Sequence, residues 1–263
     1  PNRKRLQGLG SHFRKNIDGV ELMTERKSLH WKAFLLALGI STAVFLPFLL
    51  YNGGYFIFIG DFNAQQIPFY KLVHQAVREG NFGWSWTTDL GANFIASYSF
   101  YNLTSPFFWL TIPFPNDWVP FLMAPLLILK NACAALTSYF YLARFVRRRE
   151  FAVLGSLLYA FSGFMFYNTF FNHFHEVVVF FPLLLIGMEE LVQNNRRGFF
   201  AVAVALNAVV NYWFFIGSAV FCILYFAFRC TDKSWGANFK KFCWVAFEAL
   251  LGMGLSLFIF LPA

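Results

Sequence analysis

The carboxylate of Asp61 is the side chain in this sequence best placed to act as a general base. It lies in a long connection between two apolar segments, residues 51–117, that also contains Glu79, Asp89 and Asp117. A carboxylate held among the Phe and Tyr rings of this connection would be partly desolvated, which raises its pKa and suits proton abstraction. A structural interpretation is also open, because Asp61 stands where the N-cap of a helix would stand.

Basic and imidazole side chains outside the apolar segments could bind a phosphate group. Lys71 and Arg78 lie in the same long connection, and cationic side chains are natural phosphate ligands. Further along, His173, His175 and Glu176 form a short polar cluster that could bind phosphate or orient a base. The His-x-His-Glu spacing also admits a divalent metal, although two histidines on one turn are weak evidence for one. A purely interfacial role for the cluster is equally open.

The composition indicates a membrane protein. Of the 263 residues, 58% are hydrophobic and 13% are charged, whereas a soluble domain is typically about 45–50% apolar and about 25% charged. The net charge of +8 would suit a nucleic-acid partner, but the basic residues gather at the ends of apolar segments instead, so we expect none. The four cysteines lack metal-ligand spacing and are expected to be small buried hydrophobic residues.

Seven apolar segments are predicted to cross the membrane as helices. About 20 apolar residues are needed for one crossing, and the segments are residues 31–50, 118–143, 151–167, 177–192, 199–210, 214–228 and 242–260. A tight turn at residues 211–213 is expected to separate the fifth from the sixth. We therefore predict an all-α integral membrane protein with a basic, cytoplasmic juxtamembrane segment at residues 1–30 and a transmembrane module at residues 31–263.

The distribution of Lys and Arg predicts the orientation in the membrane. Eighteen of the 21 lie on the side of the N-terminal tail, in residues 1–32, 144–150, 193–198 and 229–241. Lys71 and Arg78 lie on the other side. Because cytoplasmic loops are enriched in Lys and Arg, the N-terminus is expected to be cytoplasmic and the 51–117 connection to face outward.

The outward connection is expected to contain surface helices. A helix lying along the membrane surface is predicted over residues 63–79 from apolar residues at helical spacing, Ile67, Tyr70, Val73 and Val77. Gly80 is expected to terminate it, and a second short helix is predicted over residues 102–110. The tryptophans of the region are expected either to form an interfacial belt or to stack on sugars: Trp84, Trp86, Trp109 and Trp118.

A few polar residues fall inside the predicted spans. Lys130 is costly in hydrocarbon, so it is expected to face the protein interior, where Glu248 of the last span is a candidate partner. Asn207 and Asn211 are expected to form hydrogen bonds between helices. Asp117, just before the second span, is expected to cap that helix, and Asp89 is either an Asx-turn residue or a substrate contact.

Several short motifs, taken in order along the chain, resemble the YfhO family of bacterial multi-spanning membrane proteins. They are Gly60–Asp61 with Gln65 or Gln66, DLGANF at 89–94, YNLTSPF at 101–107, FSGF at 161–164 and FPLLLIGME at 181–189. That family resembles the GT-C glycosyltransferases, which share a transmembrane module whose long first outer loop carries an acid and surface helices. The resemblance implies a GT-C-like fold over residues 31–263, with Asp61 as the loop acid.

The resemblance further implies an inverting glycosyltransferase at the outer face of a bacterial plasma membrane. A sugar would pass from an undecaprenyl-phosphate-linked donor to an extracellular acceptor such as lipoteichoic or wall teichoic acid, with Asp61 as the general base. No cofactor is required by this chemistry, and a divalent metal is compatible with it. The candidate substrate- or phosphate-binding residues are Asp89, Lys71, Arg78, His173, His175, Glu176, Gln65, Asn93 and Tyr101.

Two other classes of function stay open at this point. One is a flippase or transporter of lipid-linked sugars, and the other is a non-catalytic scaffold in envelope assembly. A transporter is expected to carry polar residues through the middle of the membrane and paired broken helices. The polar residues of this sequence are instead concentrated in the predicted outward connections, which favours the enzyme.

Overall fold

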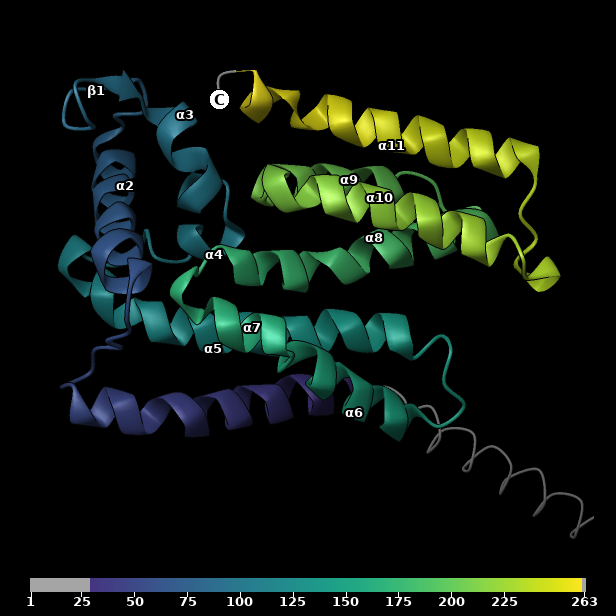
Figure 1. Ribbon diagram of the computed structural model, residues 1–263, viewed down its shortest axis with the longest axis horizontal. Helices are drawn as coiled ribbons and strands as arrows, with labels where there is room; N and C mark the ends of the chain where they lie inside the picture. The colour runs from purple at the N-terminus through teal and green to yellow at the C-terminus, as the bar shows by residue number, and fades with distance from the viewer. Residues whose placement is uncertain (1–28, 262–263) are drawn as a thin grey trace, which may run out of the picture.

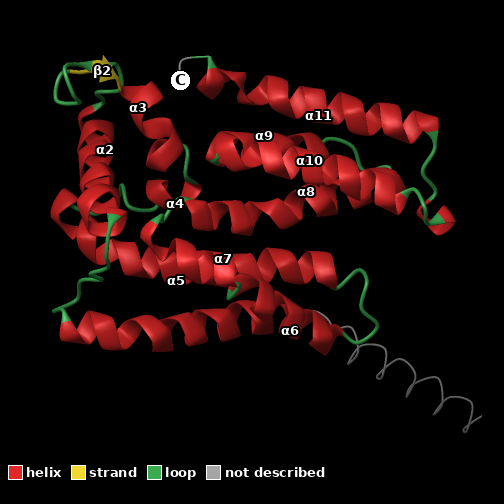
Figure 2. Ribbon diagram, viewed as in Figure 1, coloured by secondary structure: helices red, strands yellow, loops and turns green. Residues whose placement is uncertain are grey.

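The computed structural model describes residues 29–261, and most of them are helical (Figures 1 and 2). Within that range the sheet structure is one pair of two-residue strands, β1 (Trp84–Ser85) and β2 (Ala92–Asn93). The predicted all-α integral membrane architecture is confirmed. The predicted basic segment at residues 1–30 lies almost wholly outside the described residues.

Among residues 29–261, five helices have the length and apolar composition needed to cross a bilayer. They are Leu29–Tyr51, Asn116–Leu142, Arg149–Phe170, Tyr212–Arg229 and Phe239–Phe260. The second contains α5 (Val119–Leu142), the third joins α6 (Arg149–Ala160) to α7 (Gly163–Tyr167), and the last two are α10 and α11. Large apolar side chains on the outer surfaces of these helices are exposed, as expected for a surface that contacts lipid. Ile223 of α10, for example, is 69% exposed.

The two remaining predicted segments form α8 (Phe174–Asn194) and α9 (Phe199–Val210). α8 has 21 residues but carries three glutamates, which distinguishes it from the five spans. α9 has 12 residues, or about 18 Å of helix, which is shorter than a hydrocarbon core of roughly 30 Å. The predicted turn is confirmed, because α10 begins at Tyr212 with Asn211 as its N-cap.

The helices run side by side between two ends that we name by their residues (Figure 1). The loop end carries residues 52–118 and 168–173, and the basic end carries residues 143–148, 195–198 and 230–238. The first helix enters from the basic end, and α11 finishes at the loop end. The chain therefore crosses between the ends an odd number of times, as the predicted arrangement of spans requires.

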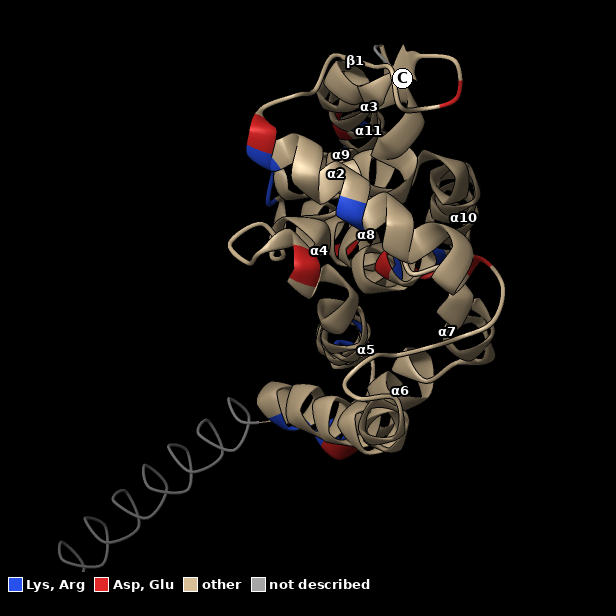
Figure 3. Cartoon of the chain, turned by 90° about the vertical axis from the view of Figure 1, so that its left-hand side faces the viewer, with Lys and Arg blue, Asp and Glu red and all other residues tan. Residues whose placement is uncertain are grey.

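Short helical elements cover the loop end. They are η1 (Phe62–Gln66), α2 (Ile67–Glu79), α3 (Phe94–Tyr98), η2 (Ser99–Leu103), α4 (Pro106–Trp109) and η3 (Asn116–Trp118). α2 runs across the end of the bundle rather than along it, and Figure 3 shows it in front of the spans. The predicted helix over 63–79 is confirmed, and it ends at Gly80 with φ of 72°. The predicted helix over 102–110 is interrupted, because Ser105 caps α4 through a bond from the amide of Phe108 to its side chain.

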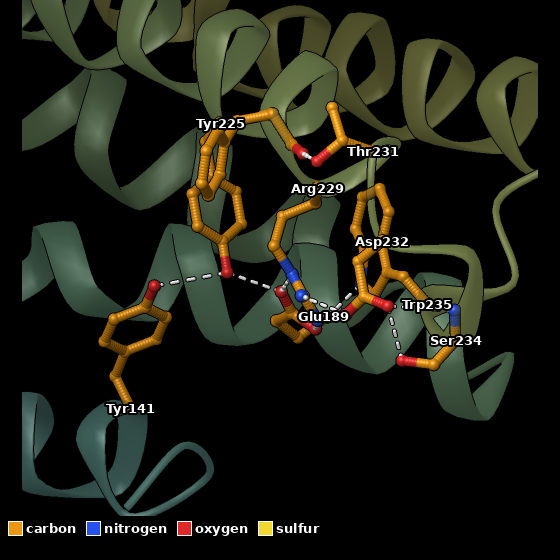
Figure 4. A network of polar contacts seen from close by, with 9 residues as sticks. Tyr141, Glu189, Tyr225, Arg229, Thr231, Asp232, Ser234 and Trp235 are labelled. Atoms are coloured by element: carbon orange, nitrogen blue, oxygen red, sulfur yellow. Dashed lines mark hydrogen bonds and ion pairs between the residues drawn. The ribbon is translucent and has the colours of Figure 1, made fainter.

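A network of buried charges joins α8 to α10 at the basic end (Figure 4). The guanidinium of Arg229 donates to Oε1 of Glu189 at 2.7 Å, and the indole of Trp235 donates to Oε2 at 2.8 Å. The hydroxyl of Tyr225 also donates to Glu189 and accepts a bond from Tyr141 of α5 at 3.2 Å. Glu189 therefore holds the basic ends of two helices and the following loop together.

Helices α9 and α11 pack with almost no space between them. A Cβ placed on Gly252 of α11 would lie 2.5 Å from the carbonyl oxygen of Ala201 and 2.6 Å from Cβ of Val204. Nearby, Oε1 of Glu248 accepts the amide of Gly198 at 2.8 Å, so that α11 supplies an acceptor to the first turn of α9. The predicted pairing of Glu248 with Lys130 is wrong, because this carboxylate satisfies backbone donors at the start of a neighbouring helix.

The two asparagines predicted to join helices have different roles. The side-chain amide of Asn207 in α9 donates to the carbonyl oxygen of Phe180 in α8 at 3.1 Å, so this prediction is confirmed. Asn211 instead accepts the amide of Phe214 at 3.1 Å and caps α10. An Asn between two helical segments is a favoured N-cap, and this local role explains why it does not reach across to another helix.

Candidate functional site

Asp61 lies exposed at the start of η1. It occupies the N-cap position of that element, but its side chain makes no capping hydrogen bond. The interpretation of Asp61 as a helix-capping residue is therefore wrong. The chain around it is fixed by its neighbours. Phe62 is fully buried against the ring of Phe56, and the side chain of Asn63 accepts the amide of Phe58 at 3.3 Å. An open carboxylate is thus held on an ordered segment.

The segment around Asp61 connects two hollows in the surface. One is shallow and is lined by residues 57–60 with Asn63 and Ala64, which flank Asp61 on both sides. The other is an apolar cavity of about 300 Å³ between the first helix, α5, α6 and α7. Phe58 lines both hollows. A ligand with its apolar tail in the cavity and its polar end in the shallow hollow would therefore lie beside the residues that flank Asp61.

The apolar cavity has a small polar floor. Most of its wall is aromatic or aliphatic, with Phe45, Phe48 and Phe166 among the lining residues. Its polar residues include Asn131, whose amide donates to the hydroxyl of Ser41 at 3.0 Å. His175 also lines the cavity and is bonded through Nε2 to the carbonyl oxygen of Met165 at 2.8 Å. This buried His is therefore part of the cavity wall.

A second set of contacts joins η1 to the start of α8. The amide of Gln66 donates to Gln65 at 3.1 Å, and its oxygen lies 3.2 Å from Nδ1 of His173. The ring of Tyr101 lies 5.2 Å from the His173 ring, centroid to centroid. The structure thus brings together three of the predicted site residues, Gln65, Tyr101 and His173, beside the element that Asp61 begins.

A buried polar cluster lies beneath these residues. The ammonium of Lys130 is 2.7 Å from Oε1 of Glu176, and it donates to the side chain of Asn172 at 2.8 Å. The hydroxyl of Ser105 donates to the same oxygen of Glu176 at 2.5 Å. The hydroxyl of Tyr70 from α2 is buried in the same region. The cluster ties α2, α4, α5 and α8 together under the loop end.

Burial sets the protonation of this region. It lowers the pKa of His173 to about 3, with the positive charge of Lys130 as the second cause. The imidazole is therefore neutral near pH 7 and offers ring nitrogens rather than a cation. Burial also raises the pKa of Tyr70, and the negative charge of Glu176 adds to this effect, so the phenol keeps its proton. Both groups can thus donate or accept hydrogen bonds without changing charge.

The remaining predicted residues lie apart from this cluster and have other contacts. Lys71 is 3.6 Å from Asp117, and Arg78 donates to the carbonyl oxygen of Phe114 at 2.8 Å. Asn93 caps α3 by accepting the amide of Ala96 at 3.0 Å. Asp89 is exposed, with a positive φ of 50° that fits a turn. The expected helix cap at Asp117 is wrong, since its side chain faces Lys71 and caps nothing.

Three members of the buried polar cluster were not predicted from the sequence. Tyr70 falls on the apolar face of a predicted helix, and Asn172 and Ser105 carry no pattern that points to a site. The buried position of Lys130 was the one available indication that polar partners must converge here. Among the residues from 29 to 261, no group of three or more His, Cys, Asp or Glu is arranged to hold a metal.

Comparisons with known proteins agree with the motifs. Residues 33–263 match the family described as Bacterial membrane protein YfhO. The chain is also 26% identical over 192 residues to the Uncharacterized protein YfhO of Bacillus subtilis (strain 168), an alignment that covers 68% of this chain and 22% of that protein. This chain therefore corresponds to less than a quarter of that relative, and no solved structure matches it significantly. The chain is a multi-pass membrane protein that belongs to the YfhO family.

Proposed function

We propose that this protein transfers a sugar from a polyprenyl-phosphate carrier to a cell-envelope acceptor, with Asp61 as the general base. The observation that carries the proposal is that the residues on both sides of Asp61 line a shallow open hollow, which shares Phe58 with an apolar cavity of about 300 Å³. An isoprenoid tail suits the aromatic wall of the cavity. Its phosphate and sugar would then lie at the mouth, beside an exposed carboxylate.

The sugar-transfer reaction requires few catalytic groups. The acceptor hydroxyl oxygen attacks the anomeric carbon, and its proton passes to a carboxylate oxygen of Asp61. The bond from the anomeric carbon to the phosphate oxygen breaks, and the lipid phosphate leaves with the electron pair. Because the phosphate is stable as an anion, no general acid is required, and the single displacement inverts the anomeric configuration. A divalent metal is compatible with this reaction but is not needed for the proton transfer.

Neutral hydrogen-bonding groups beside Asp61 are suited to the departing phosphate. His173, Gln65 and Tyr101 are brought together at the start of α8, and buried dipoles stabilise developing charge without reorganising. Lys71 and Arg78 interact with Asp117 and Phe114 instead. We therefore assign the phosphate to the His173 side of α2 and not to these two cations.

The test is sugar transfer by membranes that contain the whole protein. They are incubated with undecaprenyl phosphate carrying radiolabelled glucose or N-acetylglucosamine, and with wall or lipoteichoic acid as the acceptor. Label is expected in the acceptor with wild-type membranes and at least about a hundredfold more slowly with Asp61→Asn, the range for loss of a general base. The matched control is Glu150→Gln, which neutralises an exposed acid at the opposite end of the bundle.

The other outcomes separate the competing functions. Equal transfer by wild-type and Asp61→Asn proteins would exclude this residue as the base. Movement of labelled lipid across the bilayer with no labelled acceptor would favour the flippase. If neither transfer nor movement depends on the protein, while envelope assembly still requires it, the scaffold is the better explanation.

A further inference from the structure

A second cleft opens at the loop end, between α2 and the ribbon formed by β1 and β2. Its volume is about 520 Å³, and small-molecule sites typically occupy about 300–1,000 Å³. One wall is the polar face of α2, and the other is the ribbon with the start of α3. The residues used in the argument below are Lys71, Gln75, Glu79, Trp84 and Asn116.

The ribbon presents the indole of Trp84 to this cleft. Trp84 is 52% exposed, although it lies in an ordered pair of strands opposite Asn93. Gly91 packs beneath the ring, with a φ of 106°, and a Cβ there would lie 2.8 Å from the indole nitrogen. Glycine thus provides both the backbone conformation and the space that the ring requires. The indole is therefore held by its contact with the backbone at Gly91, although about half of the residue's surface is exposed.

Hydroxyl groups anchor the same ribbon to α3. The hydroxyl of Ser85 is 2.8 Å from that of Thr88, which is 2.9 Å from the phenol of Tyr98. Tyr98 is itself buried against Phe94. An exposed aromatic ring on an anchored ribbon suits ligand contact, because its position is fixed before binding and little conformational entropy is lost.

The charges on the cleft wall favour an uncharged ligand. The amide of Gln75 donates to Oε1 of Glu79 at 2.9 Å, and the ammonium of Lys71 lies 3.6 Å from Asp117 just outside the cleft. Lys71 and Glu79 carry opposite charges, so the wall has no excess of either sign, which suits a neutral sugar unit of a teichoic acid rather than its anionic backbone. The groups that remain are amides, hydroxyls and an aromatic face. This combination matches a saccharide, whose hydroxyls bind polar side chains and whose C–H face stacks on indole.

We propose that this cleft binds one or two sugar units of the acceptor, separately from the lipid-linked donor. The assignment deepens the proposed function and rests on it for the role of the bound saccharide. It gives the two sides of α2 different tasks: η1 and the start of α8 receive the donor phosphate, and the α2–ribbon cleft receives the acceptor glycan. It also gives Trp84 a role in specificity instead of membrane anchoring.

Sugar binding by the whole protein in lipid nanodiscs tests the assignment. Saturation transfer from the protein is recorded to methyl glucoside and to chitobiose, with a glycerol phosphate oligomer as the anionic probe. Transfer to the sugars is expected for the wild type, and Trp84→Ala is expected to weaken binding about tenfold, as for loss of one stacking contact. Trp84→Phe should retain most of the affinity and so exclude misfolding as the cause. Trp213→Ala, which removes another exposed tryptophan, on α10, is the matched control.

Three results would overturn the assignment. They are unchanged sugar affinity in Trp84→Ala, binding of the glycerol phosphate oligomer alone, and no saturation transfer to either sugar. The variant Asp61→Asn distinguishes this failure from that of the proposed function. If Asp61→Asn and wild-type proteins bind sugar equally while neither transfers label, the cleft assignment stands and the proposed reaction does not.

Discussion

The ammonium of Lys130 and the carboxylate of Glu176 form an ion pair of 2.7 Å in which the side chains are 0% and 1% exposed. Lys130 comes from the middle of α5 and Glu176 from the first turn of α8. The side chains of Asn172 and Ser105 complete the hydrogen bonding around the pair. Buried charges of this kind are strongly coupled, because removal of one partner leaves the other unpaired in a medium of low polarity.

We expect Glu176→Gln and Lys130→Met each to lower the free energy of unfolding by about 3–5 kcal/mol, the usual cost of breaking a buried pair. The double variant should be less destabilised than the sum of the two, since no unpaired charge remains. Apparent unfolding midpoints in detergent give the comparison. A double variant whose loss equals the sum would show that the two charges do not interact in the folded protein.

Protonation of His173 should make the fold sensitive to acid. The pKa of this buried ring is lowered from 6.5 to about 3, so below pH 6.5 the unfolded chain binds a proton that the folded protein does not. Stability is therefore lost as pH falls, and at pH 5 this single histidine should cost about 2 kcal/mol relative to pH 7. His173→Gln should show a correspondingly shallower decline in unfolding midpoint between pH 7 and pH 5.

The matched control for His173 keeps its ring and removes a partner. Gln66→Leu deletes the acceptor at 3.2 Å from Nδ1 of His173 while the imidazole stays in place. This variant should be less stable at every pH, and it should keep the acid sensitivity of the wild type. Burial also lowers the pKa of His175 to about 3, so part of the pH dependence should remain in His173→Gln. Loss of the pH dependence in Gln66→Leu, or an undiminished dependence in His173→Gln, would show that His173 is not responsible for it.

The sequence was sufficient to predict the five described helices that are long and apolar enough to cross a bilayer, because a helix in lipid must satisfy its backbone internally and cover itself with apolar side chains. It was also sufficient for α2, whose apolar residues repeat at helical spacing and whose end is marked by Gly80. The partner of Lys130 could not be predicted in the same way. Glu176 lies in the first turn of α8 and Glu248 near the middle of α11. The choice between them depends on which helices are neighbours in three dimensions.

The candidate site was likewise only partly predictable from the sequence. Asp61, Gln65, Tyr101 and His173 could be selected from the sequence, although only the structure shows that the last three converge. The cations Lys71 and Arg78 were selected for their type and lie elsewhere, because residue type carries no information on which side of α2 a side chain projects. The apolar cavity could not be predicted, since its wall comes from helices far apart in sequence.

Close packing of α9 against α11 predicts an unusual effect of a small substitution. Gly252→Ala should destabilise the protein by about 1–3 kcal/mol, the range for overpacking, because its Cβ would lie 2.5 Å from a backbone oxygen. Gly254→Ala is the matched control two residues away, where nothing lies within 4 Å of the added carbon. The thermal unfolding midpoints of both variants test this prediction. Equal midpoints would mean that α9 and α11 can move apart without loss of stability.

The orientation of the bundle is open to a direct test with engineered thiols. Leu90 is 99% exposed at the loop end, and the native Cys230 is exposed at the basic end. In a background in which the other cysteines are replaced by Ser, we expect a membrane-impermeant maleimide to label Leu90→Cys in intact cells. In the matched protein, Leu90 is kept and Cys230 is the remaining cysteine. This thiol should react only after the cells are permeabilised. This result is expected because the basic residues that flank the spans are retained on the cytoplasmic side. The reverse pattern would place Asp61 in the cytoplasm, where an extracellular acceptor could not reach it, and would remove the basis of the proposed reaction.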